Sequence, residues 1–306
     1  MRGPGHTAAV RQVALVTAEG EDEVLAVSLP GGRVTGRVRL AARPTTVAAG
    51  AAGPAVAVSP RSGTVTILRP RTLRPVAVLR GFRSPQIAAV APGGHWALVS
   101  DAAAGSVSAI DLDTGRIADR VRVGRGAHHL AISPDGSAAW VALGETARTI
   151  VTLDCSDMLR LTVTGRLHPP VAAHDLAFSP SGATVWVTSA AAPYVTVFDA
   201  ASGRPLARVP AGAPPQHVAF AGPGIPRAYI ASGYGSSLEM VDPGSRRVVR
   251  RTALPYGSFN LAVAGDVVVT TSLLDGRVTE LAAATLRRRM QRTVAPEARA
   301  VAIAAW

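Results

Sequence analysis

The stretch LAISPDGSAAWVAL, residues 130–143, consists of an apolar run, a turn sequence and a second apolar run. The stretch LAFSPSGATVWVTS, residues 176–189, has the same order. Short apolar runs joined by Ser-Pro-X-Gly predict two adjacent antiparallel strands, because Pro and Gly favour tight turns. The similarity of the two stretches predicts a repeat protein.

Seven copies of this repeat follow one another, and in each copy alanine follows the first apolar residue. The copies begin at Val47, Ala88, Leu130, Leu176, Val218, Leu261 and Val301, 40 to 46 residues apart. A third and a fourth run follow in each copy, as in VSAIDLDTG (107–115) and RIADRVRVG (116–124). Four short strands in about 42 residues are typical of one β-propeller blade. The alanine predicts a strand lying close to its neighbours, and the larger residue after it is expected to fill the core.

The two ends of the sequence together supply the four strands of one blade. Residues 12–18, 23–29 and 33–40 read as a second, a third and a fourth strand, whereas residues 300–306 read as a lone first strand. We therefore predict an all-β chain with one domain over residues 1–306. This domain is a seven-bladed β-propeller with four antiparallel strands per blade, in which the last blade combines three N-terminal strands with one C-terminal strand.

WVTS (186–189), with SPSG before it and VTVFDAASG (195–203) after it, resembles the YVTN family of seven-bladed β-propellers, as does SPDG followed by WVAL. The resemblance covers the whole chain at the level of the repeat. The YVTN family includes scaffolds and surface proteins, and related propellers include lactonases and lyases of the virginiamycin B type. Because these motifs build the fold, the function has to be argued from a site.

The composition narrows the classes of partner. The net charge of +12 comes from arginine alone, since the sequence contains no lysine. The runs SRRVVRR (245–251) and LRRRMQR (286–292) fall on fourth strands, where edge charge discourages aggregation between strands. Stacking aromatics and nucleic-acid modules are absent from the sequence, so we expect no nucleic-acid partner. The one cysteine, Cys155, excludes an intrachain disulfide.

The cellular location is an expectation from the same sequence. No apolar stretch is long enough to span a bilayer, and the first residues lack the apolar run of a signal peptide. We expect a cytoplasmic monomer without membrane contact, or an extracellular protein if a leader has been removed ahead of residue 1.

The two positions before each first strand are expected to meet at one mouth of the central channel. The first of these positions is occupied by Thr45, Gln86, His128, His174, Gln216, Phe259 and Arg299, and the second by Thr46, Ile87, His129, Asp175, His217, Asn260 and Ala300. Four of the seven histidines lie in these positions, in three consecutive blades. Histidine titrates near neutral pH and serves as acid, base or metal ligand, so these blades form the candidate site.

Three interpretations of the candidate site stay open. In the first, these side chains form a wet polar lining that caps the blade edges. In the second, they bind a small molecule, with His128, His174 or His217 as catalytic acid or base. The expected ligand-binding residues are then Gln86, His129, Glu145, Asp175, Tyr194, Gln216, Tyr234, Phe259, Asn260 and Arg299. In the third, His128, His174 and Asp175 hold a divalent metal ion, with His217 as a further candidate, although no local motif such as HExxH fixes the geometry.

The virginiamycin B lyase type implies a histidine, a carboxylate and Mg²⁺ at the channel mouth, and Glu145 and Glu297 are the candidates for the carboxylate. Asp101 and Arg148 are expected at the rim. In contrast, Asp111, Asp199 and Asp242 precede turns and are expected to bind turn backbone.

Two functions are consistent with these features. The first is a YVTN-type binding protein or scaffold that engages a small ligand or a protein at the channel mouth. The alternative is an enzyme, a lyase, an isomerase or cyclase, or a lactonase-type hydrolase, acting on a small molecule similar to a secondary metabolite.

Overall fold

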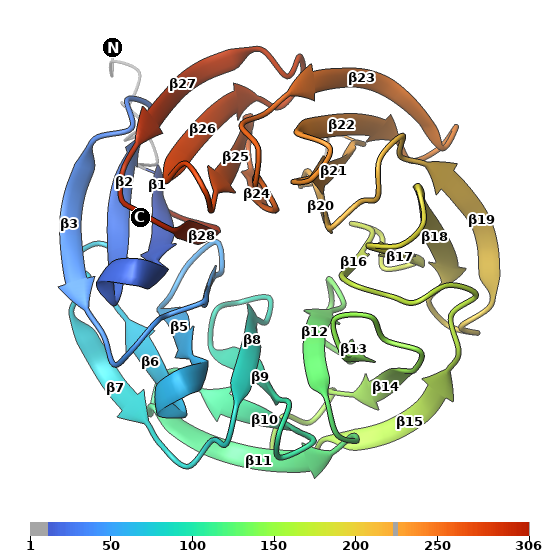
Figure 1. Cartoon of the computed structure of the whole chain (residues 1–306). Coiled ribbons are helices and arrows are strands. Elements are labelled where there is room, and N and C mark those ends of the chain that lie inside the picture. Colours follow the sequence, from blue (N-terminus) through green and yellow to red (C-terminus); the bar gives the residue numbers. More distant parts are fainter. Residues whose placement is uncertain (1–11, 223–225, 306) are drawn as a thin grey trace, which may run out of the picture.

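The computed structural model describes residues 12–222 and 226–305, and these residues form twenty-eight β-strands and two short 3₁₀ turns. The strands make seven four-stranded antiparallel sheets, arranged as the blades of a ring (Figure 1). This confirms the predicted seven-bladed propeller. Residues 1–11, 223–225 and 306 lie outside the described part. They include Trp306 of the expected last strand and most of the N-terminal residues that we expect not to form a signal peptide.

The blades are numbered here from the one that contains the first strand. Blade 1 consists of β28 (Ala298–Ala305), β1 (Gln12–Ala18), β2 (Glu23–Leu29) and β3 (Val34–Arg39). Blade 2 consists of β4 (Thr46–Ala49), β5 (Ala55–Ser59), β6 (Thr64–Leu68) and β7 (Pro75–Leu79). Blade 3 consists of β8 (Pro85–Val90), β9 (Trp96–Asp101), β10 (Ser106–Asp111) and β11 (Arg116–Arg122). The 3₁₀ turns η1 (Glu19–Glu21) and η2 (Pro60–Ser62) connect strands in blades 1 and 2.

The other four blades have the same order of strands. Blade 4 consists of β12 (Ala127–Ile132), β13 (Ala138–Leu143), β14 (Ile150–Asp154) and β15 (Thr162–Leu167). Blade 5 consists of β16 (Leu176–Phe178), β17 (Thr184–Val187), β18 (Tyr194–Asp199) and β19 (Pro205–Pro210). Blade 6 consists of β20 (His217–Phe220), β21 (Ala228–Ser232), β22 (Ser237–Asp242) and β23 (Arg247–Ala253). Blade 7 consists of β24 (Asn260–Ala264), β25 (Val267–Ser272), β26 (Arg277–Ala282) and β27 (Arg288–Thr293).

Blade 1 closes the ring with strands from both ends of the chain. The C-terminal strand β28 pairs antiparallel with β1, with Val13 opposite Ala304 and Val16 opposite Val301. In every blade the first strand lies nearest the central channel (Figure 1). The residues that precede the first strands therefore meet at one end of this channel.

The core lies between neighbouring blades, and the first strands alternate between two such cores. In β12, Leu130 and Ile132 pack with residues of blade 3, whereas Ala131 packs with residues of blade 5. Successive side chains of a strand point to opposite faces, so the alanine column faces the following blade throughout. The expectation of close approach at this position is met.

A larger side chain at this position is expected to overpack the space between blades. We predict that Ala131→Leu lowers the free energy of unfolding by about 1–3 kcal/mol, because the facing core is already filled around Trp140 and Phe178. Urea unfolding measures this change. The matched control is Ala118→Leu on the outer strand β11, where the side chain is exposed and the change is expected to be within about 0.5 kcal/mol. Equal effects of the two substitutions would contradict this packing.

The turn aspartates have the structural role predicted for them. The Asp111 carboxylate accepts hydrogen bonds from the backbone N–H groups of Asp113 (2.9 Å) and Thr114 (3.0 Å). Asp199 and Asp242 bind their turns in the same way. Asp101 was expected at the rim but is fully buried, and its carboxylate accepts backbone N–H groups of neighbouring loops.

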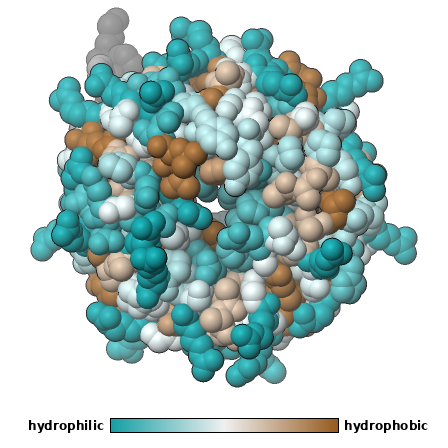
Figure 2. All heavy atoms as spheres, viewed as in Figure 1, coloured by the Kyte–Doolittle hydropathy of each residue, from teal (hydrophilic) through white to brown (hydrophobic). Residues whose placement is uncertain are grey.

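On the face of the ring shown in Figure 2, polar residues predominate, and the centre is hollowed. The arginines of the two predicted runs lie on β23 and β27 and in the turns that lead into them, at the outer edge of blades 6 and 7. Within residues 12–222 and 226–305, no helix is long and apolar enough to cross a membrane.

Candidate functional site

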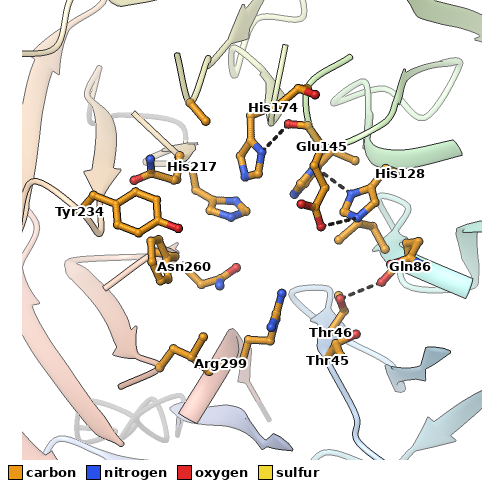
Figure 3. Close-up of a pocket in the computed structure, with 17 residues that line it drawn as sticks. Thr45, Thr46, Gln86, His128, Glu145, His174, His217, Tyr234, Asn260 and Arg299 are labelled. Atoms are coloured by element: carbon orange, nitrogen blue, oxygen red, sulfur yellow. Dashed lines mark hydrogen bonds and ion pairs between the residues drawn. The ribbon is translucent and has the colours of Figure 1, made fainter. Parts of the chain in front are cut away.

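All seven blades contribute to a cavity of about 330 Å³ at one mouth of the channel (Figure 3). It is lined by Thr45, Thr46, Gln86, Ile87, His128, His129, Glu145, Thr146, His174, Ala190, Gln216, His217, Tyr234, Phe259, Asn260, Leu273 and Arg299. Twelve of these seventeen residues occupy the two positions before the first strands. The sequence repeat therefore predicted where this cavity lies.

Hydroxyl groups of one blade hold the backbone at the mouth of the next. Ser100 donates a hydrogen bond to the carbonyl of His128 (2.6 Å), and Thr188 donates one to the carbonyl of Gln216 (2.7 Å). Thr271 makes the same contact with Arg299 (2.5 Å). These bonds link neighbouring blades directly at the cavity and fix the residues that line it.

A β-bulge explains why two adjacent histidines of blade 4 both line the cavity. The pairing of β12 with β13 shifts register between Ala127 and Leu130, which leaves His128 and His129 outside the regular ladder. In a regular strand, adjacent side chains would point to opposite faces.

The histidines of the next two blades are held by the strand beside them. The backbone N–H of His174 donates to the carbonyl of Thr188 (2.9 Å), and the N–H of Asp175 donates to the Thr188 hydroxyl (2.9 Å). His217 begins β20 and pairs with Ala231. His217 is thus positioned by a regular strand, whereas His174 is positioned by hydrogen bonds in the segment just before β16.

Three of the imidazoles form a compact group, here called the histidine cluster: His129, His174 and His217. Each offers a ring nitrogen, and the three nitrogens lie within 4.8 Å of one another. The ring centroids are 4.5 Å apart for His129 and His174, 5.3 Å for His129 and His217, and 5.4 Å for His174 and His217. Three nitrogen donors at this spacing can bind one metal ion.

Every ring of the histidine cluster has its Nδ1 engaged by another protein group. Nδ1 of His174 donates to the backbone carbonyl of Glu145 (2.8 Å), and Nδ1 of His217 lies 3.2 Å from Oδ2 of Asp175. Nδ1 of His129 lies 3.0 Å from Nδ1 of His128. Such partners fix the tautomer and leave the Nε2 atom of each ring free to bind a metal ion. This arrangement is common around metal-binding histidines.

His128 links the histidine cluster to Glu145 at the surface. Its Nε2 lies 3.5 Å from Oε1 of Glu145, whose side chain is 68% exposed. Because Nε2 faces a carboxylate, it carries the proton, and Nδ1 of His128 then accepts a hydrogen bond from His129.

Burial favours the neutral form of three imidazoles, those of His128, His129 and His174. It lowers the pKa of His128 to about 4, and it lowers the pKa of the fully buried His129 well below the usual value of 6.5. Burial also lowers the pKa of His174, and the neighbouring His217 adds to this effect. Neutral imidazole is the form that binds metal ions.

The lowered pKa values predict a dependence of stability on pH. Between about pH 6.5 and 4 the unfolded chain binds protons on these histidines and the folded chain does not, so the free energy of unfolding falls as the pH falls. His128 alone accounts for up to about 3 kcal/mol of this loss. Urea unfolding of metal-free protein at pH 7 and pH 4.5 measures it.

The control separates His128 from other acid-sensitive groups. His128→Gln is expected to lose less stability on acidification than the unsubstituted protein. His95→Gln, at an exposed histidine paired with Asp113, is expected to leave the dependence unchanged. Identical pH profiles for all three proteins would contradict the burial of His128.

The structure places the predicted ligand-binding residues in the cavity wall with two exceptions, Asp175 and Tyr194, and it also places Glu297, a candidate for the carboxylate, outside this wall. Asp175 lies behind His217 and also accepts a hydrogen bond from the N–H of Val218 (3.1 Å). Tyr194 packs under the Arg208 guanidinium, 4.8 Å from its ring centroid. Glu297 pairs with Arg43 (3.0 Å), away from the histidines.

The donors that lie closest together differ from the metal set expected from the sequence. The expected set was His128, His174 and Asp175, with His217 as a further candidate, whereas His129, His174 and His217 bring their nitrogens together. His128 and Asp175 instead contact the Nδ1 atoms of His129 and His217. Sequence reasoning also missed Thr146, Ala190 and Leu273, which lie in the loops after second strands, at places equivalent to Glu145 and Tyr234.

Comparison with known proteins relates this chain to others by fold. No protein-family model matches the sequence, and no curated protein is significantly similar to it. Solved structures with the same architecture include a protein of unknown function from Desulfotomaculum acetoxidans, with a TM-score of 0.83 and 13% identity over 95% of this chain and 98% of that one. Apo AztD from Citrobacter koseri has a TM-score of 0.76 and 10% identity over 97% and 99% of the two chains.

A third structure is hydrazine synthase from Kuenenia stuttgartiensis. Its TM-score is 0.67, with 19% identity over 78% of this chain and 76% of that one. Identities this low show a shared β-propeller fold and carry no residue roles to this chain.

Proposed function

We propose that this protein binds a divalent transition-metal ion at the channel mouth through His129, His174 and His217. The observation that carries the proposal is that three imidazoles converge while the Nδ1 of each is engaged by a neighbouring group. A structural lining would require neither the convergence nor the three free nitrogens.

The donor set favours Zn²⁺ over Mg²⁺. Imidazole suits zinc, copper, nickel and iron, whereas Mg²⁺ prefers carboxylate, carbonyl and water oxygens. Three protein ligands leave a fourth position of a tetrahedral ion open toward the cavity. The Mg²⁺ chemistry implied by the virginiamycin B lyase type is therefore not what this site fits best.

Calorimetric titration of metal-free protein tests the proposal. We expect one equivalent of Zn²⁺ or Co²⁺ to bind, with no heat from Mg²⁺ under the same conditions. The dependence of the heat on the ionisation enthalpy of the buffer measures the protons released on binding, and His129 and His174, whose pKa values are lowered by burial, are expected to release few at pH 7. Zn²⁺ binding weaker than millimolar, or equal binding of Mg²⁺, would refute the proposal.

A catalytic role is the second candidate, and the open fourth position favours it. Three histidines and one water are the ligand set of several hydrolytic zinc enzymes, in which the ion lowers the pKa of its water. The Glu145 carboxylate stands at the same mouth and could accept the proton of that water. Lactone opening by zinc-loaded protein, lost in Glu145→Gln while zinc binding is retained, would support this role; no turnover of γ- or δ-lactones would leave binding as the function.

The YVTN assignment belongs to this proposal as well. It is supported by the Ser-Pro-X-Gly turns and by the WVTS block, both of which lie at equivalent places in the blades. A small ligand at the mouth agrees with the first function expected from the sequence.

A further inference from the structure

The wall of the cavity that faces the histidine cluster has a different chemistry. Blades 6, 7 and 1 contribute Tyr234, Phe259, Asn260 and Arg299 to it (Figure 3). The Phe259 ring packs against Gly233, where a side chain would collide with it, and Tyr234 lies edge-on to Phe259 at 4.9 Å. This wall combines an apolar surface with hydrogen-bond donors.

Arg299 is anchored so that its guanidinium reaches into the cavity. Its Nη1 donates to Oε2 of Glu19 (3.0 Å), and Glu19 is itself buried and bound by Arg43. Within the described part of the chain, the other guanidinium nitrogens of Arg299 make no hydrogen bond. They remain available to a carboxylate, which arginine binds in a bidentate manner.

Gln216 provides a second unpaired donor at this site. Its side chain is 3% exposed, and its Oε1 accepts a hydrogen bond from the N–H of Gly233 (2.8 Å). Its Nε2 has no partner among the described residues. A buried donor without an acceptor costs about 1–3 kcal/mol, and because Nε2 has almost no exposed surface, the Gln216 side chain has to turn toward the cavity before a ligand oxygen can accept its hydrogen bond.

The charges of the residues that line the cavity also favour an anionic ligand. Among the described residues that line it, Arg299 is the one arginine and Glu145 the one carboxylate, and Glu145 is mostly in water. The carboxylates of Asp175 and Glu19 lie behind His217 and Arg299 and do not line the cavity. A bound ion would therefore add positive charge at the cavity surface itself, where an anionic ligand can meet it.

We propose that the ion-loaded cavity binds a small organic dicarboxylate between the histidine cluster and Arg299. One carboxylate occupies the open position of the ion, and the other accepts hydrogen bonds from the free side of the Arg299 guanidinium. The volume of about 330 Å³ suits a ligand of this size. This inference rests on the proposed function, because the first carboxylate needs the ion.

The test uses Co²⁺-loaded protein and succinate as the probe. Co²⁺ reports its ligands through its visible absorption, so replacement of water by a carboxylate changes the spectrum. We expect a saturable change with succinate and none with succinamide, which has the same chain length but no charge. Arg299→Gln is expected to weaken succinate binding at least about tenfold, while Co²⁺ still binds with one-to-one stoichiometry.

The controls separate the possible failures. Arg122→Gln makes the same change of charge at an exposed position on β11 and is expected to bind succinate as the unsubstituted protein does. Arg299→Lys retains a charge beside Glu19 but lacks the planar fork. It is expected to give intermediate affinity, and it replaces Arg299→Gln if the latter does not fold.

Each remaining outcome is decisive. Co²⁺ binding without a response to succinate would overturn the dicarboxylate site alone. The same conclusion would follow from equal succinate affinity in the Arg299 variants and in Arg122→Gln. Failure of Co²⁺ to bind would overturn the metal site and, with it, the dicarboxylate site.

Discussion

Replacing His174 by alanine is expected to weaken Zn²⁺ binding by more than about 100-fold. The substitution removes one of three nitrogen donors, and the loss of a ligand exceeds the 10- to 100-fold effect typical of residues behind a ligand. His174 is a suitable choice because its Nδ1 contacts only the exposed loop at Glu145, so water can replace that hydrogen bond. Competition with a zinc-binding dye measures the affinity.

Two further variants make this result specific. His128→Ala is expected to weaken binding by about 10- to 100-fold, because His128 orients His129 without being a ligand. His95→Ala removes an exposed histidine paired with Asp113 and is expected to have no effect. A loss in His128→Ala as large as that in His174→Ala would show that His128 is itself a ligand, as expected from the sequence.

Removing the C-terminal strand is expected to abolish cooperative folding. A chain that ends at residue 297 lacks β28, whose residues Val301, Ala302, Ile303 and Ala304 are all at least 90% buried. Its loss also leaves the whole inner edge of β1 without hydrogen-bond partners. Domains have only about 5–15 kcal/mol of stability, and the loss of one strand of blade 1 removes contacts with blades 2 and 7 together. Thermal unfolding followed by circular dichroism is expected to show no sharp transition.

A circular permutant distinguishes loss of the strand from loss of chain continuity. Joining residue 306 to residue 1 through a flexible linker and opening the chain in the exposed turn at 243–246 keeps every strand. This permutant is expected to unfold cooperatively, because β28 still pairs with β1. A sharp transition in the shortened chain would mean that the ring does not depend on closure by both termini.

The repeat made the fold predictable because it marks the strands, the turns and the closure of the ring. Ala131 and its six equivalents mark the first strands, the Ser-Pro-X-Gly turns mark the hairpins, and the unmatched strands at residues 12–40 and 300–306 indicate closure. The same repeat predicted which residues reach the channel mouth. A given position of the repeat has the same location in every blade, because each blade packs on its neighbours in the same way.

The composition of the site was less predictable, for reasons of local geometry. The bulge in β12 turns His128 and His129 to the same cavity, whereas a regular strand separates such neighbours. Asp175 follows His174 directly but binds His217 of the next blade, a contact between residues 42 apart in the sequence that no local spacing indicates. Tyr194 lies in the expected region of blade 5, yet its contact with Arg208 keeps it out of the cavity wall.

The position of the histidine cluster within the ring has a mechanical consequence. Blade 1, where the two ends of the chain meet, lies across the channel from blades 4 and 5 and is separated by blade 7 from blade 6; blades 4, 5 and 6 supply the three imidazoles (Figure 1). An ion on the cluster would tie these three blades together at a place remote from the seam in blade 1. Amide hydrogen exchange in β12, β16 and β20 is then expected to slow on metal loading, while exchange in β28 stays the same. The ring would thus open first at blade 1, and blades 4, 5 and 6, which hold the ion, would be the last to separate.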